Sequence, residues 1–459
     1  MDKKKPKKSG SLGIAVAWRN GDTQTRLSLL ILGLGSLVRG QIGRFVIFIA
    51  IQVCYITYMA LYGVHSLASF VTLGTVEQGE VYNEKLGIFE YSIGDNSMLI
   101  LLYGVITIMI TLGYICFMMG SVRCAYSAQT GAGAGKKLPT LREDLATLLD
   151  SNLHKLLLTW PILGILFFTI IPIIFMILIA FTSYDRSHQP PGNLFGWVGL
   201  ENFNAMFTAG GQFSSTFWPV LGWTLIWAVC ATSSCYILGM LLAIVINRKG
   251  TKLKGFWRFN FVLSIAMPSF VSLLTMRTVF ANNGAYNILL RAIGMLAPSE
   301  TFSYFGDALT AKLMVILINI WIGVPFTMLT TTGILQNIPA ELYEAAQVDG
   351  AKPARTFFSI TLPYMLFVTT PYLITTFVGN INNFNVIFLL TGGGPDTLDY
   401  HVAGRTDLLV TWLYKLTIVN KDYNLGSVIG IAVFILMATF SLMAYRRSGA
   451  YKNEEEFQK

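Results

Sequence analysis

The sequence predicts an all-α integral membrane protein with about eight transmembrane helices. Of the 459 residues, 54% are apolar and only 12% are charged, whereas a soluble domain carries about 25% charged residues. The apolar residues gather in long blocks, each long enough to cross ~30 Å of hydrocarbon. Lysine and arginine lie beside these blocks rather than on one polar domain, so the net charge of +9 indicates membrane orientation rather than nucleic-acid binding.

Residues 1–44 precede the first long block. A lysine run with a proline occupies Asp2 to Lys8, and we expect it to be disordered and cytoplasmic. The stretch from Leu27 to Val38 is apolar but too short to span, and Gly and Arg flank it. We interpret it as an interfacial or re-entrant helix that leads into the first span.

Eight apolar blocks are long enough to cross the bilayer at about 20 residues each. They are residues 45–70, 97–121, 156–182, 216–246, 257–280, 310–334, 364–390 and 425–445. When the N-terminus is assigned to the cytoplasm, the inside segments hold 25 Lys and Arg and the outside segments hold 6. This asymmetry predicts a multi-pass protein of the cell membrane with both termini in the cytoplasm.

Residues 131–137 read Gly-Ala-Gly-Ala-Gly-Lys-Lys and invite comparison with a phosphate-binding loop. Such a loop requires a glycine five residues before the Gly-Lys pair and a Ser or Thr after the lysine. Those positions hold Thr130 and Lys137 here. We therefore expect a flexible cytoplasmic linker, and ATP would have to bind another chain.

Other function classes find little support. The sequence contains no Gly-x-Ser-x-Gly or His-Glu-x-x-His pattern, and its histidines and cysteines make no metal-ligand spacing. We therefore predict no catalytic and no metal-binding residue. No Asp or Glu lies near the midpoint of a predicted span, which argues against a proton-coupled transporter. A transport subunit without enzymatic activity is the expected class.

The cytoplasmic loop 338–363 predicts a compact pair of helices on the inner face of the membrane. Pro339 can open a first helix, good helix formers fill 341–348, and Gly350 can supply a left-handed cap. A second short helix is expected from Pro353 to Thr361, ending before the following proline. The loop would be packed against its own spans by Phe357, Phe358 and Ile360.

This loop resembles the EAA motif of binding-protein-dependent ABC importer permeases, in the pattern Glu344-Ala-Ala-x-x-Asp349-Gly350-Ala351 followed by Phe357 or Phe358, Ile360 and Leu362-Pro363. The resemblance implies the type I ABC importer permease fold and a coupling helix that seats in a cleft of an ATPase subunit. By this resemblance, Glu344 and Gly350 mediate docking. The implied ATPase-coupling residues are Glu344, Ala345, Ala346, Asp349, Gly350 and Ala351.

The resemblance extends over about residues 161–447. The segment from Asn382 to Pro395 is similar to sugar permeases of the carbohydrate-uptake branch. The segment from Ala403 to Val410 narrows the similarity to the larger, MalF-like subunit of maltose and maltodextrin importers. The loop 183–215 is short where the Gram-negative subunit carries a large periplasmic domain. It is similar to the Gram-positive form, whose sugar-binding protein is a lipoprotein.

The resemblance also implies an organisation and a set of partners. The expected parts are a cytoplasmic segment 1–44, two N-terminal helices with a linker 45–155, a permease core 156–447 and a cytoplasmic tail 448–459. The expected partners are a homologous second permease, an ATPase homodimer, an extracellular solute-binding protein and an oligosaccharide of the maltodextrin type. No cofactor is expected in this chain, because ATP and Mg would bind the ATPase.

A sugar site in a bilayer needs amide and hydroxyl groups for the sugar's OH groups and aromatic faces for its C–H surfaces. Asn380 and Asn383 are three residues apart in the seventh predicted span and share a helix face. Asn319, Gly323 and Phe326 share a face of the sixth span at i, i+4 and i+7. Such amides are costly in lipid unless they line a cavity or pair with a neighbour.

Ser269 follows Pro268 in the fifth predicted span, where the proline could break the helix. The alternative role for these polar residues is contact between helices, with glycine allowing close packing. The family resemblance favours sugar binding, because the maltose-contacting positions fall on Ser269, Asn319, Gly323, Phe326, Asn380 and Asn383. Two aromatic contacts of the family fall on Ile265 and Gly379, which suggests less stacking or a differently shaped sugar.

Two alternatives stay open. One is a permease of the same class for another oligosaccharide, a sugar alcohol or an acidic oligosaccharide. The other is an ion-coupled secondary transporter, against which the EAA resemblance and the lack of mid-span carboxylates both argue.

Overall fold

The computed structural model describes residues 14–83, 87–208, 210–248 and 250–447. The chain divides into two compact units, one up to Val198 and one from Gly199 onward. Within the described residues, seven helices are long and apolar enough to cross a membrane, or eight if one bent pair counts as a single span. The predicted fold class is therefore confirmed.

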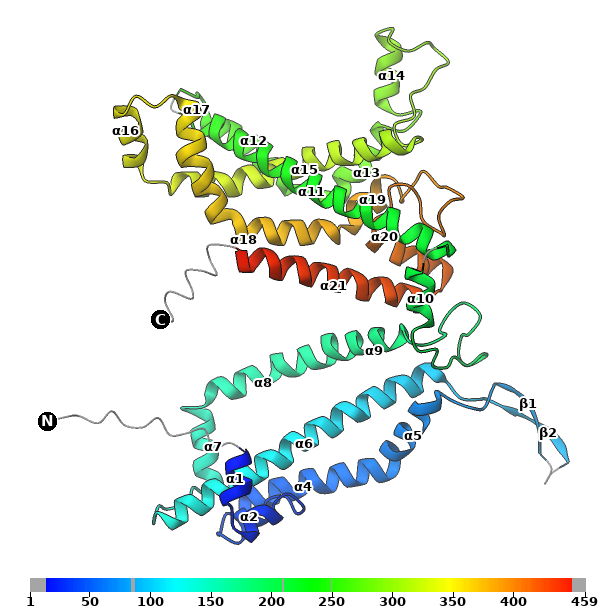
Figure 1. Ribbon diagram of the computed structural model, residues 1–459, viewed down its shortest axis with the longest axis vertical. Coiled ribbons are helices and arrows are strands. Elements are labelled where there is room, and N and C mark those ends of the chain that lie inside the picture. Colours follow the sequence, from blue (N-terminus) through cyan, green and yellow to red (C-terminus); the bar gives the residue numbers. More distant parts are fainter. Residues whose placement is uncertain (1–13, 84–86, 209, 249, 448–459) are drawn as a thin grey trace. The chain divides into compact units, whose positions relative to one another are not determined.

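The first unit contains three of these spans, Ile42–Thr72, Ser97–Gly133 and Leu153–Ile179. In this unit the short helices α1, α2 and α7 lie at one end of α4 and α6, and a β-hairpin lies at the other end (Figure 1). The third span belongs to this unit, whereas the sequence analysis assigned it to the permease core. The helices are α1 (Ile14–Asn20), α2 (Thr23–Leu27), α3 (Leu34–Leu37), α4 (Ile42–Tyr58), α5 (Val64–Thr72), α6 (Ser97–Gly133), α7 (Leu141–Leu149), α8 (Leu153–Ile165) and α9 (Ile171–Ile179).

Two π-helical turns keep the first and third spans continuous. They are Met59–Gly63 between α4 and α5, and Leu166–Ile170 between α8 and α9. The hairpin consists of antiparallel strands β1 (Gly79–Asn83) and β2 (Ile88–Ser92), which lie between α5 and α6 in the sequence. The sequence analysis did not anticipate these strands.

The stretch from Leu27 to Val38 does not form the single interfacial helix that was predicted. After α2 the chain turns, and α3 is only four residues long. Gly33 adopts a left-handed conformation with φ +80°, and its N–H donates to Ser121 Oγ of α6 at 2.7 Å. The Leu32 N–H donates to Gln52 Oε1 of α4 at 2.8 Å. Side chains of neighbouring helices therefore satisfy backbone groups that a continuous helix would have paired internally.

The glycine-rich segment 131–137 is only partly a linker. Helix α6 continues through Gly133, so the first three residues of the segment are helical. The irregular connection begins at Ala134 and ends where Thr140 caps α7, its Oγ1 accepting from the Glu143 N–H.

The second unit contains four of the seven spans and the bent pair. The long helices α11, α15, α18 and α21 run alongside one another, with α16 and α17 at one end and α14 at the other (Figure 1). The helices are α10 (Glu201–Phe207), α11 (Gln212–Asn247), α12 (Lys254–Ala266), α13 (Ser269–Val279), α14 (Ala285–Ala292), α15 (Ala308–Gln336), α16 (Ala340–Val348), α17 (Pro353–Thr356), α18 (Leu362–Ile381), α19 (Phe384–Leu390), α20 (Leu409–Tyr414) and α21 (Tyr423–Arg447).

The fifth predicted span is broken, as the proline indicated. Helices α12 and α13 meet at an angle of 90°, with Met267 and Pro268 between them. Proline lacks an N–H and pushes the preceding residue into an extended conformation, which Met267 adopts at φ −79° and ψ 130°. The break leaves Ser269 at the first position of α13.

The helix of the seventh predicted span begins and ends at residues other than those predicted from the sequence. Its helix stops at Ile381 rather than near 390, because Asn383 caps the separate helix α19. At the other end, the helix that begins at Pro353 continues into α18 instead of ending before Pro363. A π-helical turn at Phe357–Thr361 directly precedes α18, and such local adjustments re-satisfy groups that a proline would otherwise leave unpaired.

Candidate functional site

Helix α11 organises the second unit, because its buried side chains contact α13, α15 and α19. Trp227 is completely buried in a core that also contains Leu273 of α13, Ile318 of α15 and Ile387 of α19. These four helices carry or flank every residue that the sequence analysis assigned to sugar binding except Asn380, which lies in α18.

Asn380 and Asn383 lie together, as their spacing predicted. The Asn383 Nδ2 donates to the Asn380 Oδ1 at 3.4 Å. Asn380 is fixed from α11 by two contacts: its Nδ2 donates to Thr232 Oγ1 at 2.9 Å, and its carbonyl accepts from Trp227 Nε1 at 3.1 Å. Asn383 Oδ1 also accepts from the Val386 N–H and so caps α19. The pair is held by the packing of α11 against the end of α18.

These bonds leave hydrogen-bonding capacity on both amides. A side-chain amide offers two N–H donors and two acceptor lone pairs. Asn380 has one donor and one lone pair engaged in the contacts above. Both side chains are partly exposed, so a hydroxyl-rich ligand can use the remaining groups without disturbing the helix contacts.

Asn319 and Gly323 also face α11. Asn319 Nδ2 lies 3.6 Å from Cys235 Sγ, and Cys235 Sγ lies 3.8 Å from the Asn319 carbonyl oxygen. A β-carbon added at Gly323 would lie 2.7 Å from the same Sγ atom. The structure therefore confirms that these two residues share a face, and it shows that the face abuts α11.

Ser269 and Phe326 are both exposed on the second unit. Ser269 begins α13 immediately after the 90° bend, and the Phe326 side chain is 52% exposed on α15. Among the described residues, a hydrogen bond joins Asn383 to Asn380, and Asn319 and Gly323 both lie against Cys235. Both pairs meet α11, at Thr232 and Cys235 respectively.

Residues of α11 that were not predicted from the sequence hold the predicted site. Thr232 and Cys235 contact the two asparagine groups, and Gly239 lies close to Thr327 and Met328 of α15. These three small residues are spaced i, i+3 and i+7 within an apolar block, which is the pattern of a close helix–helix contact in membranes. That pattern could have identified α11 as the partner.

A buried polar cluster fixes the loop that follows α19. Asp407 is 1% exposed, and its Oδ2 accepts from Lys415 Nζ and from the Gly404 N–H, both at 2.7 Å. Gly393 has φ +90°, and a β-carbon there would collide with the Asp407 carboxyl group. Burial raises the pKa of Asp407, and the nearby Lys415 charge opposes that rise. Through Asp407, this cluster connects the residues around Gly393 to the residues around Gly404.

The EAA-like loop forms the expected first helix. Pro339 precedes α16, and Gly350 follows it in the left-handed conformation at φ +70°. The hydroxyl group of Tyr343 in α16 lies 3.0 Å from the Oγ1 atom of Thr361, in the π-helical turn that precedes α18. Glu344 and Asp349 are exposed. The helix therefore presents an exposed face while its Tyr343 side is fixed to the membrane-spanning part.

The base of this loop is tied to α11. Tyr236 and Met240 of α11 form a buried cluster with Ile338 and Met365, and Phe357 packs against it. Phe358, which was also expected to pack against the spans, is 64% exposed. A hollow of about 430 Å³ is lined by several of the predicted coupling residues, namely Ala346, Asp349, Gly350 and Ala351. Ala345, another predicted coupling residue, is exposed on α16.

Comparisons with known proteins agree with this architecture. The family described as binding-protein-dependent transport system inner membrane component matches residues 235–448. The chain is 32% identical to the maltodextrin transport system permease protein MdxF of Bacillus subtilis, over 93% of this chain and 95% of that protein. It is 35% identical to the galactooligosaccharides transport system permease protein GanP of the same organism, over 78% and 85% of the two chains.

Two further matches cover a smaller part of this chain. The maltose/maltodextrin transport system permease protein MalF of Salmonella typhimurium is 36% identical over 54% of this chain and 48% of that protein. A solved bacterial ABC transporter involved in the import of the acidic polysaccharide alginate has a chain that matches with a TM-score of 0.53 at 22% identity, over 66% of this chain and 96% of that chain. This last match supports the fold.

Proposed function

Because this chain belongs to the family of binding-protein-dependent transport system inner membrane components, we propose that it is the larger permease subunit of an importer for maltodextrin-type oligosaccharides. It is a multi-pass inner membrane protein of the sugar ABC permease type. The observation that carries the maltodextrin assignment is the nearly full-length similarity to a maltodextrin permease.

The proposed complex has further subunits. A homologous permease pairs with this chain, an ATPase homodimer binds ATP and Mg, and an extracellular lipoprotein delivers the sugar. The exposed face of α16 docks on the ATPase through Glu344, Asp349 and Gly350. Both termini lie in the cytoplasm, as the distribution of Lys and Arg indicates.

Transport proceeds by alternating access, and α11 connects the two functional regions of this chain. Closure of the ATPase pair moves α16, whose base contacts Tyr236 and Met240. The same helix holds Asn380 through Thr232, one turn away from Tyr236. A rigid displacement of α11 therefore changes the sugar site when ATP binds.

The sugar contacts are Ser269, Asn319, Gly323, Phe326, Asn380 and Asn383. The two amides at 380 and 383 supply donors and acceptors for sugar hydroxyls, and Phe326 supplies an exposed ring for stacking. Ile265 and Gly379 stand where the family has aromatic contacts. A galactooligosaccharide is therefore the second candidate substrate. The similarity to a galactooligosaccharides transport system permease protein supports this candidate.

The decisive experiment measures ATPase activity of the co-purified complex in lipid nanodiscs with its binding protein. The sugar panel contains maltose, maltotriose, maltotetraose and galactobiose. Stimulation by the maltose series supports the proposal, whereas stimulation by galactobiose alone assigns the second substrate. If no ATPase co-purifies with intact permease, the importer assignment is wrong.

Variants of the chain test its two regions separately. Asn380→Ala and Asn383→Ala should lower sugar-stimulated activity at least about tenfold, because each removes hydrogen bonds to the sugar. Asn260→Ala, at an exposed site on α12, is the matched control. Gly350→Pro should abolish coupling because proline cannot adopt φ +70°, whereas Gly350→Asn should retain it. Full activity of both asparagine variants would contradict the site.

A further inference from the structure

The connection after α6 forms one wall of a basic pocket in the first unit. The pocket has a volume of about 580 Å³ and lies between the α3–α4 turn and the segment that joins α6 to α7. Its lining includes Arg39, Lys136 and Lys137 and no carboxylate. The two lysines end the glycine-rich segment that lacks the requirements of a P-loop. The pocket therefore gives that segment a role that the import function does not explain.

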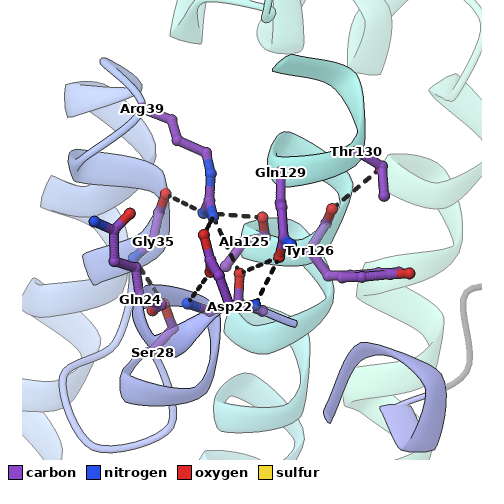
Figure 2. A network of polar contacts seen from close by, with 10 residues as sticks. Asp22, Gln24, Ser28, Gly35, Arg39, Ala125, Tyr126, Gln129 and Thr130 are labelled. Atoms are coloured by element: carbon purple, nitrogen blue, oxygen red, sulfur yellow. Dashed lines mark hydrogen bonds and ion pairs between the residues drawn. The ribbon is translucent and has the colours of Figure 1, made fainter. Parts of the chain in front are cut away.

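One wall of the pocket is rigid. Arg39 is held in the network shown in Figure 2, where its guanidinium group donates to Asp22 Oδ2 at 2.5 Å and to the carbonyl oxygens of Gly35 and Ala125 at 2.7 and 3.2 Å. Its side chain is only 9% exposed. Burial raises the pKa of Asp22, but hydrogen bonds from Thr25 and Arg39 outweigh it and lower that pKa overall. Arg39 is thus a fixed and neutralised part of the wall.

The opposite wall is fixed by other contacts. Gln41 Nε2 donates to the Pro139 carbonyl oxygen at 3.0 Å, which joins the two sides. Arg44 forms a bidentate pair with Asp144 at 2.5 and 2.6 Å. Glu143 accepts from the Thr140 N–H at 2.7 Å, and this bond, with a smaller effect of Lys137, lowers its pKa. The neighbouring carboxylates are therefore engaged with other groups.

Lys136 and Lys137 supply the exposed positive charge of the pocket, and nearby Glu143 offsets part of the charge of Lys137. Both are exposed, and neither takes part in an ion pair among the described residues. Two ammonium groups at a polar hollow with a rigid back wall suit a compact anion that accepts several hydrogen bonds. A phosphate group has this chemistry.

The position of the pocket indicates where the phosphate comes from. The span that begins with α4 starts at Ile42, one residue after the pocket wall, and α6 ends at Gly133. The pocket thus lies at the ends of two spans, where lipid headgroups are expected. Val38 and Ile42 on either side are exposed and apolar, which suits the start of acyl chains. Basic pockets between transmembrane helices on the cytoplasmic side are known sites for anionic lipid headgroups.

We propose that the pocket between Arg39–Gln41 and 132–140 binds a phosphate group, supplied in the membrane by the headgroup of an anionic phospholipid. The site is separate from the proposed sugar site and from α16. It anchors the first unit to the inner leaflet through Lys136 and Lys137.

The test compares binding of dioleoyl-phosphatidylglycerol and dioleoyl-phosphatidylcholine to the purified full complex by native mass spectrometry. The pocket variant is Lys136→Gln with Lys137→Gln. The matched control is Lys155→Gln with Lys252→Gln, which removes the same charge from exposed positions outside the pocket. A third variant, Lys136→Arg with Lys137→Arg, keeps the charge. A separate titration with inorganic phosphate measures displacement of the bound lipid.

The pocket variant should bind phosphatidylglycerol about 25-fold more weakly, since each of the two lysines near a lipid surface contributes about fivefold. The control and the arginine variant should bind it as the unchanged protein does. Displacement by millimolar inorganic phosphate would also support a phosphate site and assign its source to solution. Equal binding by the pocket variant and the control, or no preference for phosphatidylglycerol over phosphatidylcholine, overturns the proposal.

Discussion

Helices α4 and α11 are similarly apolar, yet their surroundings differ. In the most apolar 18-residue window of the span Ile42–Thr72, none of the side chains is buried within this chain. In the corresponding window of the span that contains α11, 44% are buried. Both helices satisfy the length and composition needed to cross a membrane. Apolar composition therefore identifies a span but does not reveal whether it contacts lipid, a partner subunit or the rest of its own chain.

The difference lies in what each helix contacts. Helix α11 contains Trp227, Thr232, Cys235 and Tyr236, which reach α15, α18 and the base of the EAA-like loop. Helix α4 contacts α6 through a stacked pair of rings, Tyr55 and Tyr114, and through tyrosine hydroxyls, such as Tyr58 with Thr107. Substitutions should therefore affect stability strongly along α11 and weakly along α4.

The largest effect is expected at Trp227. Trp227→Ala removes a completely buried ring and its hydrogen bond to Asn380, and it should cost about 3–5 kcal/mol of stability. Ile47→Ala on α4 should cost less than about 0.5 kcal/mol, because its side chain is exposed and lipid can fill the space. Thermal unfolding of the purified complex compares the two variants. Equal melting temperatures would remove the distinction between these helices.

Replacing either of two glycines in α11 by alanine should change the stability, and the two changes should have opposite signs. At Gly239 an added β-carbon would lie 2.7 Å from Thr327 Cβ and 3.0 Å from the Met328 backbone nitrogen, so Gly239→Ala should cost about 1–3 kcal/mol. At Gly222 nothing lies within 4 Å, so Gly222→Ala should stabilise the helix by about 0.5–1 kcal/mol. The same melting experiment measures both. Destabilisation by both substitutions would show that α11 is closely covered along its whole length.

The smallest effect concerns two hydrogen bonds between helices. Tyr236 and Thr369 join α11 to α18 at 2.7 Å, and the contact is buried. A double-mutant cycle with Tyr236→Phe and Thr369→Val should give a coupling energy of about 0.6–1.7 kcal/mol. The cycle at Tyr58 and Thr107, which are 2.8 Å apart and only partly buried, should give a smaller value. A larger value there would mean that α4 is held as firmly as α11.

The spacing of residues along the sequence predicted much of the arrangement of the candidate site. The i,i+3 relation of Asn380 and Asn383 and the i,i+4 relation of Asn319 and Gly323 predicted which residues share a face, and the structure confirms both. The sequence could not reveal that Thr232 and Cys235 hold these residues, because α11 is separated from them by 84 to 148 positions along the chain.

Local sequence by itself determined several features of the fold. Block length and charge distribution predicted the spans, Pro268 predicted the break between α12 and α13, and Pro339 and Gly350 predicted the limits of α16. These features depend on backbone sterics and on the cost of polar groups in hydrocarbon, and both act within a few residues.

Tertiary structure alone decided the remaining features. The helix passes through Pro363, the stretch from Leu27 to Val38 breaks into short pieces, and α11 becomes buried while α4 does not. In the stretch from Leu27 to Val38 the backbone found partners on distant segments, such as Ser121 for Gly33, and the side chains of α11 found partners on α15, α18 and α19. Because lipid tails are as apolar as a protein core, an apolar side chain carries no signal about which of the two it contacts, and only the packing of the helices can decide that.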